Sequence, residues 1–131
     1  MPSTAESFAY PNAAQILQNQ KITLKRGDGH ILLTNCDSGY DIQVESYIGG
    51  HYFCFTVSGK QGFVTLELPD AYGIWTKAHP VKATLTAKAD GTQEVVNAPA
   101  AQPGEQNEYT PVGETSDIGK RSVLVELRVT G

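Results

Sequence analysis

Short segments in which apolar and polar residues alternate follow one another along most of the chain, and turns that contain glycine separate them. Between residues 20 and 68 these turns carry Gly29, Gly39, Gly49-Gly50 and Gly59. Alternation with a period of two places apolar side chains on one face of a β-strand, and glycine supplies the positive φ that tight turns need. The pattern predicts a meander of antiparallel hairpins in this part of the chain.

The alternation continues toward the C-terminus. Residues 81–87 and 93–96 flank an Asp-Gly pair, which is a strong hairpin signal. Residues 71–76 are expected to form a short aromatic strand or a loop, and residues 97–120, rich in Pro, Gly and Glu, a long loop. About eight strands without a crossover helix predict an all-β fold, an antiparallel β-sandwich or a jelly-roll-like arrangement.

The last segment, residues 122–130, has the most regular strand pattern of the chain. Its alternation places Val125 and Leu127 on one face, which we expect to be the buried one. Together with Leu66 and Leu85, these two residues are predicted to form the central core.

Residues 1–20 have a different pattern and are expected to form an N-terminal arm and one short helix. Asn12 is placed to cap this helix, and Gln15 stands at the capping-box position. About two helical turns are marginal in isolation, so the helix must dock, through Ile16 and Leu17. The remaining residues, 21–131, are predicted to form a single β-sandwich domain, because 131 residues suit one domain.

Cys36 and Cys54 are the only cysteines, and eighteen positions separate them. The spacing is too wide for a Cys-x-x-Cys redox motif, and a zinc site would stay incomplete even with His51 as a third ligand. We predict a disulfide, which favours an oxidising compartment. The alternative is two buried free thiols.

Charge and hydropathy exclude some partners and bear on location. A net charge of −4 without a basic stripe argues against nucleic acid, and no stretch is apolar enough to insert into a membrane. The first residues have no signal-peptide pattern and read as a mature terminus left after signal removal, with an added Met, so a secreted location is expected. The alternative is a cytosolic protein that begins at its own Met.

Three stretches, residues 22–33, 53–60 and 123–131, resemble small secreted proteins of filamentous actinobacteria, a Streptomyces-like family of unknown function. The resemblance covers most of the chain from about residue 7 onward. It implies a secreted location and carries no activity or site with it.

No catalytic or metal-binding motif stands out, and we predict neither a cofactor nor a metal. His30, His51 and His79 lie beside three different turns without the spacing of metal ligands. No serine stands in a nucleophile-elbow sequence. The acidic turn residues lack the EF-hand pattern, and the Arg26-Gly27-Asp28 tripeptide is explained by the turn itself.

The aromatic residues in the middle of the chain are the candidate binding site. Tyr47 and Tyr52 flank the Gly49-Gly50 turn together with His51, and Tyr72 and Trp75 follow in a later segment. Exposed Tyr and Trp give large contact areas at low entropic cost, whereas the alternative is that Tyr72 and Trp75 pack one end of the sandwich. We therefore expect a secreted, non-enzymatic domain that recognises a protein or a glycan. The alternative is a secreted hydrolase, or a hydrolase inhibitor that uses the 97–120 loop.

Overall fold

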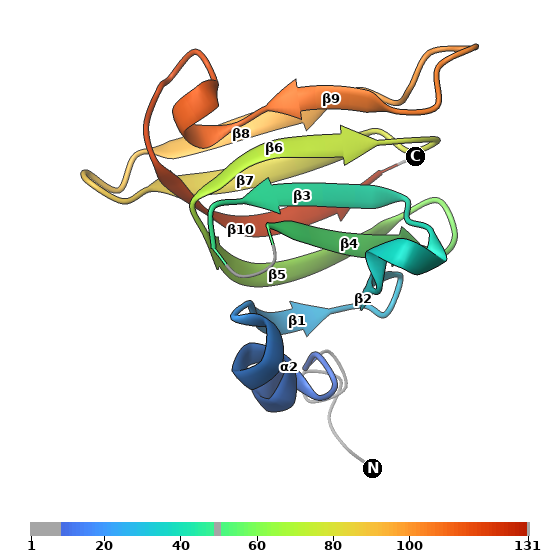
Figure 1. Ribbon diagram of the computed structural model, residues 1–131, viewed down its shortest axis with the longest axis horizontal. Helices are drawn as coiled ribbons and strands as arrows, with labels where there is room; N and C mark the ends of the chain where they lie inside the picture. The colour runs from blue at the N-terminus through green and yellow to red at the C-terminus, as the bar shows by residue number, and fades with distance from the viewer. Residues whose placement is uncertain (1–8, 49–50, 131) are drawn as a thin grey trace.

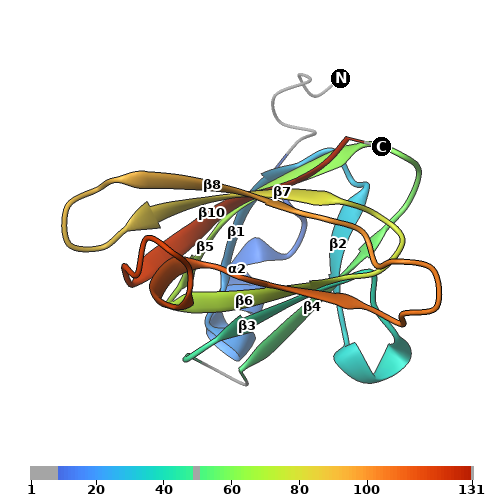
Figure 2. The same cartoon turned by 90° about the horizontal axis from the view of Figure 1, so that it is seen from above.

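Two five-stranded antiparallel sheets face each other in the computed structural model, which describes residues 9–48 and 51–130 (Figures 1 and 2). The first sheet has the order β1 (Thr23–Gly27), β5 (Gly62–Pro69), β10 (Ser122–Val129), β7 (Val81–Ala87) and β8 (Gln93–Ala98). The second has the order β2 (Ile31–Thr34), β4 (Tyr52–Val57), β3 (Ile42–Ser46), β6 (Ala71–Thr76) and β9 (Glu108–Pro111). The predicted all-β sandwich with one short helix is confirmed.

The connections between strands differ from the predicted meander. β1 and β5 belong to the first sheet, whereas β2 and β4 belong to the second, so the chain passes from one sheet to the other at two of the four turns. Only β3 and β4 are consecutive neighbours in this region. The prediction of successive hairpins was therefore wrong. Alternation shows only that each strand has one apolar face. That face is buried between the sheets whether the next strand lies in the same sheet or in the opposite one, so alternation does not reveal which strands are neighbours. The Asp-Gly hairpin between β7 and β8 is confirmed.

The apolar faces of the two sheets form one core. Its largest fully buried side chains are Phe55, Ile22, Ile31, Ile42, Leu66, Leu68, Ile74, Leu85, Leu124, Leu127, Val44 and Val64. The prediction was right for Leu66, Leu85 and Leu127 and wrong for Val125, which is only half-buried. The pairing of β10 with β7 shifts register between Leu124 and Glu126, so Val125 is an extra residue relative to β7. In the pairing with β5 the register also shifts there, but the extra residue lies on β5. An extra residue of this kind changes which of the alternating positions face the core, so Leu124 before it and Leu127 after it are both buried.

The helix α2 (Ala13–Gln20) lies beside β1 at one end of the sandwich (Figure 1). Ile16 packs against the core, whereas Leu17 is 44% exposed, so only one of the two predicted docking residues is used. The capping-box prediction was wrong, because Asn12 has a φ of 59° and its side chain caps nothing. A side-chain cap requires an extended conformation at that residue. Tyr10 anchors this region instead: its hydroxyl accepts a hydrogen bond from the Leu33 N–H at 2.7 Å.

Residues 97–120 are more ordered than the predicted long loop. They supply β9, which pairs with β6 as the edge strand of the second sheet, and the short 3-10 helix η2 (Gly113–Thr115). Residues 71–76 form the strand β6 rather than a loop. β9 is short and polar and carries little apolar alternation, so pairing with an existing sheet decides whether it forms.

Candidate functional site

The outer face of the second sheet is rich in aromatic and planar polar side chains. Ile42 and Val44 of β3 are fully buried, so Gln43 and Glu45 between them point outward. Pairing then places further residues beside them: Cys54 and Trp75 flank Gln43, Tyr52 lies opposite Glu45, and Tyr109 lies opposite Trp75. We call Tyr40, Tyr52, Trp75 and Tyr109 the aromatic face.

Trp75 and Tyr109 form its centre. Their ring centroids are 4.8 Å apart, and the rings are tilted by 52°. Gly73 makes room for this pair, because a Cβ at that position would collide with the Tyr109 ring. The indole N–H of Trp75 donates a hydrogen bond to Glu45 Oε1 at 3.2 Å, which fixes the indole on the sheet.

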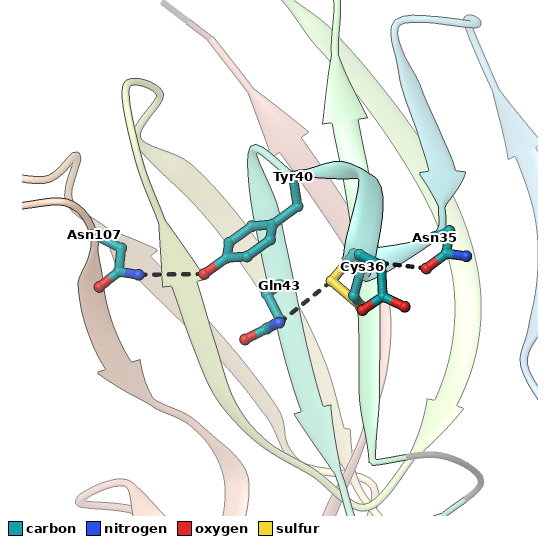
Figure 3. The surroundings of a disulfide bond; sticks show 7 residues. Asn35, Cys36, Tyr40, Gln43 and Asn107 are labelled. Carbon is teal, nitrogen blue, oxygen red and sulfur yellow. Dashed lines mark hydrogen bonds between the residues drawn. A yellow bond between two sulfur atoms is a disulfide. The ribbon is translucent and has the colours of Figure 1, made fainter.

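Beside these rings lies an open hollow of about 290 Å³. It is lined by Tyr40, Gln43, Glu45, Tyr52, Trp75 and Asn107. The Asn107 side-chain amide donates to the Tyr40 hydroxyl at 3.2 Å, which joins the segment before β9 to the segment before β3 (Figure 3). The Lys77 ammonium lies 4.3 Å from the centre of the Tyr40 ring. These contacts hold the rim of the hollow without occupying its polar floor.

The predicted disulfide between Cys36 and Cys54 is confirmed, and it lies on the same outer face (Figure 3). It links the short 3-10 helix η1 (Cys36–Ser38) to β4, with the two Cα atoms 5.2 Å apart. The Asn35 carboxamide accepts a hydrogen bond from the Asp37 N–H at 2.9 Å and so begins η1. The Gln43 amide donates to Cys54 Sγ at 3.4 Å. The disulfide thus connects the hollow to the η1 turn.

Two tyrosines of this region have raised pKa values. Burial is the main cause at both Tyr72 and Tyr109, and the nearby Glu45 carboxylate adds to it because a second negative charge is unfavourable there. Both phenols therefore stay protonated well above neutral pH. The Tyr109 hydroxyl lies 3.4 Å from the Tyr72 carbonyl oxygen, to which it donates.

The five predicted site residues divide into three groups. Tyr52 and Trp75 both line the hollow, although the sequence had suggested Tyr47 as the neighbour of Tyr52. Tyr47 stacks on Tyr72 instead, with ring centroids 4.5 Å apart. His51 is exposed at the other side of the hairpin, where its Nδ1 lies 3.3 Å from the Ser46 carbonyl oxygen.

The Tyr47–Tyr72 pair is part of a charged cluster next to the aromatic face. The Arg121 guanidinium lies 5.0 Å from the Tyr47 ring centre, and the Tyr47 hydroxyl donates to Glu114 at 3.4 Å. Arg121 also forms an ion pair with Asp70 at 3.5 Å. Tyr47 is therefore held in place by its neighbours, although 43% of the residue remains exposed. The Gly49-Gly50 tip of the predicted patch lies outside the described residues.

The predicted site lacked five residues of the observed one, Tyr40, Gln43, Glu45, Asn107 and Tyr109. Tyr109 and Asn107 lie in the segment predicted as a loop, and only the pairing of β9 brings them to the sheet. Gln43 and Glu45 carried a usable signal, because they alternate with Ile42 and Val44 and so had to point away from the core.

Two observations in the described part of the chain concern the histidines and the acidic residues. His30 Nδ1 lies 2.7 Å from the Ser58 carbonyl oxygen, so this nitrogen carries the proton and does not activate the nearby Ser58 hydroxyl. Among residues 9–48 and 51–130, no three His, Cys, Asp or Glu side chains gather in a way that could hold a metal ion. Nor does any described helix have the length and apolarity to cross a membrane.

No protein-family model matches the chain, and a search of curated proteins finds no significant match.

Proposed function

We propose that this protein is a carbohydrate-binding domain that acts through the aromatic face of its second sheet. The observation that carries the proposal is the hollow in which Tyr40, Tyr52 and Trp75 stand around the side chains of Gln43, Glu45 and Asn107. The flat faces of pyranose rings carry C–H bonds that pack on the negative faces of aromatic rings. Their hydroxyl groups need donors and acceptors, which amide and carboxylate side chains supply together.

A glycan fits this lining better than a protein surface does. Protein-binding patches have an apolar centre that excludes water and a polar rim. The six residues that line the hollow include no aliphatic side chain, and three of them are planar polar groups. Polar groups on the floor of a site stay satisfied when the ligand itself offers hydroxyl groups at every position.

The lining also favours binding over hydrolysis. A glycoside hydrolase places two carboxyl groups on either side of the scissile bond. The residues around the hollow offer one, Glu45, and its Oε1 accepts the Trp75 N–H. The inhibitor alternative required a free 97–120 loop, yet β9 and η2 within this segment are built into the sandwich.

An extracellular location is part of the same proposal. Disulfides persist in oxidising compartments, and the Cys36–Cys54 bond supports that setting. The resemblance to small secreted actinobacterial proteins points the same way.

The single tryptophan gives a direct test, because Trp75 lies in the proposed site and no other indole contributes to the fluorescence. Titration with a panel of soluble polysaccharides should give a saturable change in Trp75 emission with at least one of them. Affinity electrophoresis in gels that contain the same polysaccharide should show retardation of the wild-type protein and none of Trp75→Ala.

Val95→Ala is a matched control, since Val95 is as exposed as Tyr52 (52% and 53%) but lies on β8 of the other sheet. This variant should be retarded like the wild type. Thermal unfolding of each variant checks that it is folded. If no polysaccharide alters the Trp75 emission but a protein from the culture fluid of the organism that makes this chain does, the face is a protein-binding surface and the proposal is wrong.

A further inference from the structure

A second hollow lies next to the first, on the other side of Tyr52. Its volume is about 610 Å³, and it is lined by Ile16 and Gln20 of α2, Leu33 and Thr34 of β2, Asn35, the disulfide residue Cys36, and Tyr52. Tyr52 also lines the hollow beside Trp75. The two hollows are therefore adjacent and meet at Tyr52.

The sheet register shows the direction in which they follow each other. Thr34 pairs with Cys54, Cys54 with Gln43, and Gln43 with Trp75, so these residues form one row across β2, β4, β3 and β6. Neighbouring strands are about 4.8 Å apart, so three such steps span about 14 Å. The row runs perpendicular to the strands, from the second hollow, across the disulfide, to the indole of Trp75.

Tyr52 lies beside the middle of this row: it stands two residues before Cys54 on β4, opposite Glu45, and so on the same face of the sheet. At 53% it is the most exposed of the large apolar side chains in the described part of the chain. Its hydroxyl forms no hydrogen bond with the residues that the structure describes, whereas Tyr10, Tyr40, Tyr47 and Tyr109 each do. A ring with this freedom contributes little to folding and leaves its surface open to a ligand.

The lining of the two hollows also restricts the charge of a ligand. No Lys or Arg lines either of them, and the one carboxyl group in the two linings is that of Glu45. The Lys77 ammonium at the rim lies over the Tyr40 ring and outside the lining. An acidic polymer would bring its carboxylates or sulfates close to Glu45 without a guanidinium or ammonium group in the lining to pair with them. A polymer without charge meets no such repulsion.

We infer that the two hollows form one groove for a linear, neutral polysaccharide that crosses the strands over the Cys36–Cys54 disulfide and stacks a ring on Tyr52. This inference rests on the proposed function. It adds the substrate class, a neutral chain of several sugar units, and an orientation in which α2 contacts one end of the bound segment and Trp75 the other.

The test uses a length series of neutral oligosaccharides, from the disaccharide to the hexasaccharide, prepared from the neutral polysaccharide that gives the strongest Trp75 response. Kd should fall by about tenfold or more along the series, which is about 1.4 kcal/mol. The double variant Gln20→Ala with Thr34→Ala should bind the hexasaccharide only as tightly as the wild type binds the disaccharide. Its disaccharide affinity should be unchanged, which shows that the site at Trp75 remains intact.

Reduction of the disulfide gives a second, independent readout. Cys54 is fully buried, so a reductant reaches the disulfide from the side of the partly exposed Cys36. A bound chain that lies over Cys36 should slow thiol release by a mild reductant, and the hexasaccharide should protect more than a saturating amount of the disaccharide. A Kd that does not depend on length, equal protection by both ligands, or tighter binding of polygalacturonate than of the neutral series would overturn the inference. In each of these cases a glycan still binds, so the proposed function survives; only the absence of binding to any glycan removes both.

Discussion

Trp75 of β6 donates its indole N–H to Glu45 of β3 at 3.2 Å, across a pair of neighbouring strands on the outer face of the second sheet. This bond orients the ring that stands at the centre of the aromatic face. It also leaves a carboxylate near the hydroxyl groups of Tyr72 and Tyr109, whose pKa values are raised by burial and by this negative charge. Glu45 therefore both orients the Trp75 ring and helps to raise the pKa values of Tyr72 and Tyr109.

The stability of the protein should fall at alkaline pH because of these tyrosines. Tyr10, Tyr72 and Tyr109 all have pKa values above the ordinary 10.0, chiefly through burial. The folded state then holds these protons more tightly than the unfolded state does. Their stabilising effect is complete below about pH 10 and is lost as the pH rises through the higher, folded pKa values.

Urea unfolding at a series of pH values above about 9 measures this loss. Tyr109→Phe should lose stability with a shallower slope than the wild type, and Glu45→Gln should fall between the two because it removes only the charge. Identical slopes for all three proteins would show that Tyr109 does not contribute.

Substitution of Tyr47 should mainly affect the stability of the fold, whereas substitution of Tyr52 should mainly affect glycan binding. Tyr47→Ala removes the stack on Tyr72 and the contact with Arg121, so we expect a loss of about 1–2 kcal/mol in the free energy of unfolding. Tyr52→Ala should change this free energy by less than about 0.5 kcal/mol, since the ring is mostly exposed, yet it should abolish retention in the polysaccharide gels. Chemical denaturation of both variants decides; a large loss of stability in Tyr52→Ala would mean that its ring is structural.

The disulfide should stabilise the fold by about 3 kcal/mol, because it closes a loop of eighteen residues in the unfolded chain. For a domain of this size, reduction should then lower the midpoint of thermal unfolding by about 10 °C. Calorimetry with and without reductant measures the shift, and Cys36→Ser with Cys54→Ser should reproduce it without reductant. Two reactive thiols in denatured protein from an oxidising compartment would contradict the bond itself.

Leu127 and Val125 test the bulge in β10. Leu127 is fully buried between the sheets, so Leu127→Ala should cost about 2–5 kcal/mol through lost burial and a cavity. Val125→Ala should cost less than about 1 kcal/mol, because Val125 is half-buried and is the extra residue of β10 relative to β7. Equal losses in urea unfolding would show that the strand is regular and that Val125 faces the core.

The local pattern of residues was enough to predict the all-β class, most of the strands and the disulfide. Alternation forces one face of each strand into the core whatever its partners are, and two cysteines in an all-β chain have few other uses. For the same reason Gln43 and Glu45 had to point outward. The pairing of Cys36 with Cys54 needed no knowledge of the sheets, because there was no third cysteine to compete.

Tertiary structure alone decided which strands are neighbours and therefore what the site contains. A crossover between sheets and a hairpin within one sheet bury similar apolar surface, so alternation does not distinguish them. The bulge at Val125 reverses parity through backbone register, which leaves no trace in the sequence pattern. Asn107 and Tyr109 reach the aromatic face because β9 adds to the edge of β6, a contact made by backbone hydrogen bonds between segments far apart in the chain. Composition identified the aromatic residues, but only this pairing placed them around one hollow.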